Sequence, residues 1–154
     1  GIRPFMVEIQ SLVSPSAYGT PQRSATGFDI RRLSMLLAVL EKRAKLNLYN
    51  KDVFLNIAGG IKVVDTAVDL SIVASLLSSV TDKPVPHNIC LAGEVGLSGE
   101  IRAVNQIENR IAEAEKIGFR KIILSQYNKI TTNNNKIEIQ RIKHVGDLYR
   151  TLFQ

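Results

Sequence analysis

Hydroxyl and imidazole side chains are the groups in this sequence that could carry out nucleophilic or acid–base chemistry. Thr66 and Ser71 stand on either side of Ala67, and a hydroxyl beside a base can be activated as a nucleophile. Each also has a simpler explanation, since Thr66 suits the N-cap of a helix and Ser71 suits close packing. His87 and His144 lie in no catalytic or metal-ligand spacing, so each is expected to be an ordinary loop or surface histidine.

Basic side chains are the second group that could have a function, because they can bind an anionic partner. The net charge is +6, from 20 Lys and Arg against 14 Asp and Glu, which suits an anionic partner such as nucleic acid but does not identify one. Arg31 and Arg32 are expected in the first turn of a helix, where the helix dipole disfavours cations, so a partner for them is more plausible. Lys42, Arg43 and Lys45 suit the dipole at the other end, and a structural role is favoured for them.

The first half of the chain predicts two strands and a helix that would position these groups. Residues 5–13 are rich in β-formers and predict a strand, and Pro and Gly make 14–25 a loop. Asp29 is the expected N-cap of a helix that runs to about residue 45 and buries Leu33, Leu36, Leu37 and Leu40. A second strand covers 52–58. Lys62 follows in an extended segment, 61–64, and is either an edge-strand lysine or a phosphate contact.

The second half predicts a central helix and a glycine turn. Thr66 and Asp69 have the spacing of a capping box, and the helix to about residue 79 is apolar nearly all round, with a stripe of small residues at Ala67, Ser71, Ala74 and Ser78. Later elements are a strand over 89–95, a turn at Gly96 and Gly99, a helix over 107–117 that buries Ile107, Ile111, Ala114 and Ile117 and ends at Gly118, a strand over 121–124, a loop over 126–136, an edge strand over 137–140 and a helix from 144 or 145 to 153.

Size and composition indicate one globular domain. The 154 residues are 45% hydrophobic, and no apolar run is long enough to span a bilayer. The lone cysteine, Cys90, is expected to be a buried hydrophobe. The chain begins at Gly1 without a signal-peptide pattern, so we expect a piece of a longer protein. No phosphate-binding loop and no paired Cys-x-x-Cys occurs, so any ATPase or zinc module is expected outside this sequence.

The glycine turn also carries a family resemblance. The run Gly-Glu-Val-Gly-Leu-Ser-Gly-Glu-Ile-Arg at 93–102 resembles the segment that leads into the catalytic lysine of Lon-type proteases. Through Gly96, Ser98, Glu100 and Asn105-Gln106 it is more similar to the Lon-like domain of the RadA (Sms) family of bacterial DNA repair proteins. The resemblance covers nearly the whole chain, with matching runs at 3–4, 7–10, 25–29, 33–43, 52–54, 58–60 and 93–102.

The resemblance implies a lost catalytic site. Lon proteases use a serine whose proton is taken by a lysine with a pKa lowered in an apolar pocket. The alignment places Ala67 at the serine position, Glu108 at the lysine position and Gly96 where active members carry threonine. Alanine cannot attack a carbonyl, and a carboxylate does not reproduce a neutral amine base. We therefore expect a single, catalytically silent domain of mixed α/β (α+β) class, with the Lon protease proteolytic-domain fold (ribosomal protein S5 domain 2-like).

The resemblance also implies partners. The family carries a zinc finger and a RecA-like ATPase ahead of this domain, so zinc and ATP with Mg²⁺ are expected only there, and no metal or cofactor is expected here. It implies a bacterial cytoplasmic protein of DNA recombination and repair that assembles as a hexameric ring, contacts the DNA backbone, meets a recombinase filament and has no membrane partner. Candidate phosphate contacts, two of them flanking the former lysine position, are Arg23, Arg31, Arg32, Lys62, Arg102 and Arg110.

Two other functions stay open in the sequence. One is an active Lon-type serine peptidase, which would need a rebuilt nucleophile and base. The other is a protein-interaction scaffold that makes no contact with DNA.

Overall fold

A computed structural model of the chain describes residues 8–17, 19–58, 65–131 and 136–154. The predicted extended segment at 61–64, with Lys62, lies outside these ranges. The elements are β1 (Glu8–Pro15), β2 (Arg23–Thr26), α1 (Ile30–Arg43), β3 (Lys51–Ala58), η2 (Thr66–Val68), α2 (Asp69–Thr81), β4 (Ile89–Ala92), β5 (Glu94–Val95), β6 (Ile101–Arg102), α3 (Ile107–Ile117), β7 (Lys121–Ser125), β8 (Glu138–Ile142), η3 (Val145–Asp147) and α4 (Leu148–Phe153).

Strands β1, β3 and β2 form one sheet in that order, with β1 antiparallel and β2 parallel to β3. Helix α1 makes the crossover that the parallel pair requires. Val53, Leu55 and Ile57 of β3 belong to the main core. Leu12 and Phe54 lie opposite each other across β1 and β3, and both are exposed. One face of this sheet is therefore covered and the other is open.

Strands β4, β7 and β8 form a second sheet that is parallel throughout, with β7 in the middle. Successive residues of β7 enter different clusters: Ile123 joins the main core, whereas Ile122 and Leu124 pack with Ile111 and Ala114 of α3. A strand covered on both faces needs a continuous apolar run, which is why the sequence predicts this one correctly.

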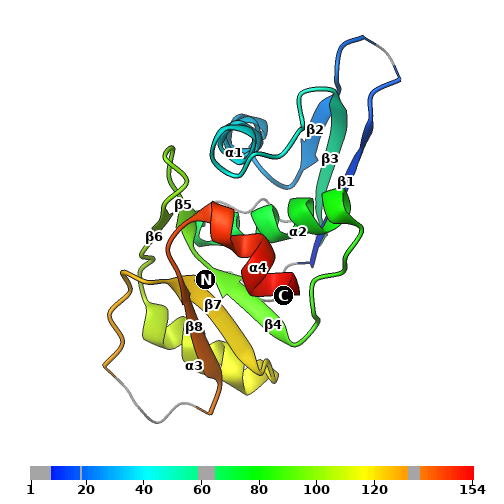
Figure 1. Cartoon of the computed structure of the whole chain (residues 1–154). Coiled ribbons are helices and arrows are strands. Elements are labelled where there is room, and N and C mark those ends of the chain that lie inside the picture. Colours follow the sequence, from blue (N-terminus) through cyan, green and yellow to red (C-terminus); the bar gives the residue numbers. More distant parts are fainter. Residues whose placement is uncertain (1–7, 18, 59–64, 132–135) are drawn as a thin grey trace.

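Helix α2 lies between the two sheets (Figure 1). Ser71, Ser75 and Ser79 follow one another at intervals of four residues and meet the edge strands on either side. The Ser71 hydroxyl donates to the carbonyl of Leu91 at 3.2 Å. Ser75 and Ser11 share a hydrogen bond of 2.7 Å, and the N–H of Val13 donates to Ser79 at 2.9 Å. These serines bind to β4 and β1, which are the edges of their sheets.

A hairpin of β5 and β6 connects the second sheet to α3 and binds the C-terminal segment. The N–H of Ile101 donates to the carbonyl of Lys143 at 2.9 Å, and that of Val145 donates to the carbonyl of Gly99 at 2.8 Å. The predicted terminal helix is present here as η3 followed by α4. The hairpin tip is thereby fixed to the last part of the chain.

Several sequence predictions need correction. The predicted loop over 14–25 contains the start of β2, a short polar strand that forms because its backbone pairs with β3. The strand predicted over 89–95 is divided into β4 and β5. Ile117 is 45% exposed instead of buried. Gly118 does end α3, with a φ of +112°.

Candidate functional site

Ala67 lies at the start of the central helix, at the position expected for a nucleophile in an active relative. Asp65 caps this turn, because its Oδ1 accepts the N–H of Ala67 at 3.0 Å. Ala67 is buried, and its carbonyl accepts the N–H of Gly93 at 3.0 Å, while the N–H of Leu70 donates back to Gly93 at 3.1 Å. The helix start is thus joined to the end of β4, and a methyl group occupies the position.

Among the described residues, neither nearby hydroxyl is paired with a base. Ser71 is bound to the Leu91 carbonyl, which supports the packing explanation of this residue. Thr66 is not the cap that its type suggested, since Asp65 has that role. In the described part of the chain, neither hydroxyl is hydrogen-bonded to a lysine or a histidine.

Arg110 joins the start of η2 to the start of α3. Its Nη2 donates to Asp65 Oδ2 at 2.9 Å and to Asn105 Oδ1 at 3.2 Å, and its Nε donates to the Asn105 carbonyl at 2.9 Å. Arg110 is only 9% exposed, so this placement argues against the phosphate contact expected of it.

Glu108, which the Lon resemblance aligns with the catalytic lysine, is exposed and bonded to a distant segment. Its Oε1 accepts the N–H and the hydroxyl of Thr131, both at 2.9 Å. The carboxylate therefore fixes a loop onto α3.

Asp69, in the first turn of α2, is fully buried and contacts Arg32 of α1. Arg32 donates from Nε to Oδ1 at 2.7 Å and from Nη2 to Oδ2, and the N–H of Val95 donates to Oδ2 at 3.0 Å. Burial raises the pKa of Asp69, while Arg32 and Val95 oppose that shift. The hydrogen bond to Asp69 raises the pKa of Arg32. The predicted capping box is wrong, because Asp69 binds α1 and β5 instead.

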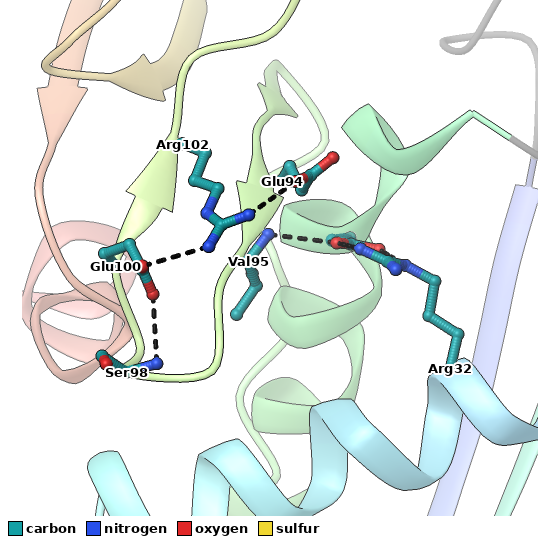
Figure 2. A network of polar contacts seen from close by, with 7 residues as sticks. Arg32, Glu94, Val95, Ser98, Glu100 and Arg102 are labelled. Carbon is teal, nitrogen blue, oxygen red and sulfur yellow. Dashed lines mark hydrogen bonds and ion pairs between the residues drawn. The ribbon is translucent and has the colours of Figure 1, made fainter.

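The β5–β6 hairpin carries a second, exposed network, drawn in Figure 2. Arg102 lies 3.5 Å from Glu94 and 3.5 Å from Glu100. Glu100 accepts the N–H of Ser98 at 3.1 Å, and its own backbone N–H, that of Ser98 and Arg102 lower its pKa. Its carboxylate lies where a side chain at Gly96 would have to be, so a larger residue at position 96 would require the Glu100 side chain to move.

The remaining candidate phosphate contacts differ in whether their side chains already have partners within the protein. Arg23 donates to the carbonyls of Lys51 and Leu48 at 3.1 and 2.6 Å. Arg31 is exposed, and no ion pair of its side chain is found among the described residues. Arg102 is exposed, and its ion pairs at 3.5 Å are of the weak surface kind. Of the described candidates, Arg31 and Arg102 are the two best placed to meet an external anion.

Sequence reasoning missed the role of His144. The N–H of Gly146 donates to its Nδ1 at 3.0 Å, so Nε2 carries the ring hydrogen and donates to the Ser98 carbonyl at 2.9 Å. Both partners are backbone groups from distant segments, which no local pattern reveals. His87 is exposed, and Cys90 is buried as predicted, with burial raising the pKa of its thiol to about 12.

Two features are absent from the described ranges. No group of three His, Cys, Asp or Glu side chains is arranged there to hold a metal ion. None of the helices in these ranges combines the length and apolar character needed to cross a membrane.

Comparison with known proteins finds one matching family model and several relatives that share one name. A family model described as subunit ChlI of Mg-chelatase matches residues 19–128. DNA repair protein RadA of Rickettsia felis is 49% identical over 148 residues, which is 96% of this chain and 32% of the relative. The proteins of the same name from Bacillus subtilis and Streptococcus pneumoniae are both 47% identical, over 98% and 99% of this chain and 33% and 37% of theirs. The chain thus spans about a third of the length of these curated relatives, in their C-terminal part.

Proposed function

Because this chain belongs to the family whose model is described as subunit ChlI of Mg-chelatase, and is about half identical to RadA repair proteins, we propose that it is the Lon-like domain of a RadA-type DNA repair protein. In this proposal the domain is catalytically silent, binds the DNA backbone and contributes to a hexameric ring. A zinc finger and a RecA-like ATPase in the remaining part of the protein supply the metal and nucleotide chemistry. The observation that carries the proposal is the sequence identity to RadA proteins, which extends over nearly the whole of this chain.

The surroundings of the former dyad support catalytic silence. Ala67 offers no nucleophile, and Ser71 is hydrogen-bonded to a strand carbonyl. Glu108 is an exposed carboxylate bonded to Thr131, and a carboxylate cannot act as the neutral amine of a serine–lysine pair. We expect no hydrolysis of casein by the purified chain, and hydrolysis that survives repurification would favour the peptidase alternative.

The distribution of free cations supports a backbone contact with DNA. Four of the six candidate cations are described with partners of their own: Arg23, Arg32, Arg102 and Arg110. Arg102 can exchange its long, exposed ion pairs for a phosphate at small cost. Arg31 has no ion pair among the described residues, so it would not have to give up a partner to bind a phosphate. The proposal therefore assigns phosphate binding to Arg31 and Arg102 first, and keeps Lys62 as an untested member.

Binding of a fluorescent duplex measured by anisotropy at low salt tests the proposal. Arg31→Glu and Arg102→Glu should each weaken binding about three- to tenfold and equally for unrelated sequences, because phosphates carry no sequence information. Lys129→Glu, a charge reversal at another exposed lysine, is the matched control for net charge. Absence of any binding would favour the scaffold alternative. Equal effects of all three variants would overturn the assignment of phosphate binding to Arg31 and Arg102.

A further inference from the structure

An exposed leucine stands at the tip of the β5–β6 hairpin. Leu97 is 71% exposed, and it lies between Gly96 and the pair Ser98 and Gly99. The hairpin projects beside α1 (Figure 1). An isolated exposed leucine is common on protein surfaces, so the argument depends on what surrounds this one.

The tip is held rigidly by backbone and side-chain bonds. The N–H of Gly99 donates to the carbonyl of Gly96, and that of Gly96 to the carbonyl of Glu100, each at 2.9 Å. Gly99 has a φ of +84°, and a Cβ there would lie 2.5 Å from Nε2 of His144. His144 itself donates to the Ser98 carbonyl. A side chain on such a tip can contact another molecule without a change in the conformation of the turn.

Arg43 and Lys143 lie close to the tip, and neither has an ion-pair partner among the described residues. The Cβ of Arg43 would be 3.0 Å from a Cβ on Gly99, and Lys143 precedes the histidine that holds the tip. Lys42 and Lys45 flank Arg43 at the end of α1. All four cations are exposed, and no ion pair involves them within the described ranges. The acidic groups of the hairpin, Glu94 and Glu100, both face Arg102.

We propose that Leu97 is a wedge that enters between two base pairs of duplex DNA while Arg43 and Lys143 hold the flanking phosphates. Proteins that unstack a base step use leucine among other apolar side chains, with cations on the neighbouring backbone. This inference rests on the proposed DNA-binding function and adds to it the site and the mode of contact. The wedge predicts tighter binding where a base step is easily opened.

Three duplexes of equal length and charge test the wedge by anisotropy: one fully paired, one with a central mismatch, and one with 2-aminopurine at a central TA step. The chain should bind the mismatched duplex about fivefold more tightly than the paired one, because a mismatched step costs less free energy to unstack. The 2-aminopurine emission should rise on binding. Leu97→Ala should abolish both effects while binding to the paired duplex changes less than about twofold.

Leu12→Ala is the matched control, since Leu12 is also exposed, at 56%, but lies on the open face of the other sheet. It should leave both effects intact. Arg43→Ala and Lys143→Ala should weaken binding to every duplex. If the chain binds DNA and Leu97→Ala changes neither readout, the wedge is overturned but the proposed function is not. If Leu97→Ala instead changes the sedimentation of the DNA-free protein, the leucine is a protein contact and the wedge is also overturned. If the chain binds no DNA, both proposals fail.

Discussion

The carboxylate of Asp69 is fully buried against the guanidinium of Arg32, so that an ion pair joins α1 to α2. The same carboxylate accepts the N–H of Val95 in β5. Three elements from distant parts of the sequence are thereby joined at one side chain.

Removal of Arg32 should be far more damaging than removal of its neighbour. Arg32→Ala leaves Asp69 buried without its partner, which typically costs about 3–5 kcal/mol when a buried pair is broken. Urea unfolding followed by circular dichroism measures this loss. Arg31→Ala, at an exposed position, should change the unfolding free energy by less than about 0.5 kcal/mol. Equal effects of the two substitutions would contradict the structural role given to the pair. Arg32→Met with Asp69→Leu should recover only part of the loss, because no buried charge remains but the N–H of Val95 loses its acceptor.

The turn at Ser98 should lose stability as the pH falls, because ionised Glu100 stabilises it. Hydrogen bonds from its own N–H and from Ser98 lower the pKa of Glu100 below its usual value of 4.5. A lowered pKa means that the ionised form stabilises the fold; this contribution is present above pH 4.5 and is lost as the pH falls through the lower, folded-state pKa. The amide signal of Ser98 in NMR spectra should therefore titrate with a midpoint below 4.5. Glu100→Gln should remove this transition, and a midpoint above 4.5 would disprove the assignment.

The thiol of Cys90 should be inert in the folded protein. With a pKa raised to about 12 by burial, about one thiol in ten thousand is ionised at pH 8, and the thiolate is the reactive form. A thiol-specific colour reagent should give no signal at pH 8 until urea unfolds the chain, and then one thiol per molecule. Rapid reaction of the folded protein would mean that the β4 strand is open to solvent.

Arg110 should matter for stability and not for DNA. Arg110→Gln removes the charged hydrogen bonds to Asp65 and Asn105, with an expected loss of about 2 kcal/mol in the free energy of unfolding. Binding of DNA by the folded variant, measured at a temperature well below its midpoint, should stay within about twofold of the parent. A tenfold loss of affinity without loss of stability would return Arg110 to the phosphate contacts.

Local pattern was enough to predict most elements of this chain. The leucine stripe of α1 repeats at helical spacing and begins after a capping Asp29, and all of this lies within one segment. The run 121–124 is apolar throughout because β7 is covered on both faces. Strand β2 was missed, because its four residues carry no apolar period and it exists through pairing with β3.

The site was less accessible to sequence reasoning, for a physical reason. Asp69 has the spacing of a helix cap, and only the folded chain brings Arg32, 37 positions away in sequence, to its carboxylate. His144 receives its two partners from Gly146 and from the distant Ser98. Arg110 and Arg23 looked like free cations, and both are used internally. A charged residue type in a sequence does not say whether its charge is already neutralised.

The salt dependence of DNA binding by this chain tests the central claim most directly. Anisotropy titrations of one duplex between low and physiological salt should give a linear fall of log Kobs against log salt concentration. About four phosphate contacts would give a slope of about −3.6, since each contact contributes about −0.9. A slope near zero, or no binding at the lowest salt concentration, would contradict the claim that this domain acts through its cationic surface on the DNA backbone.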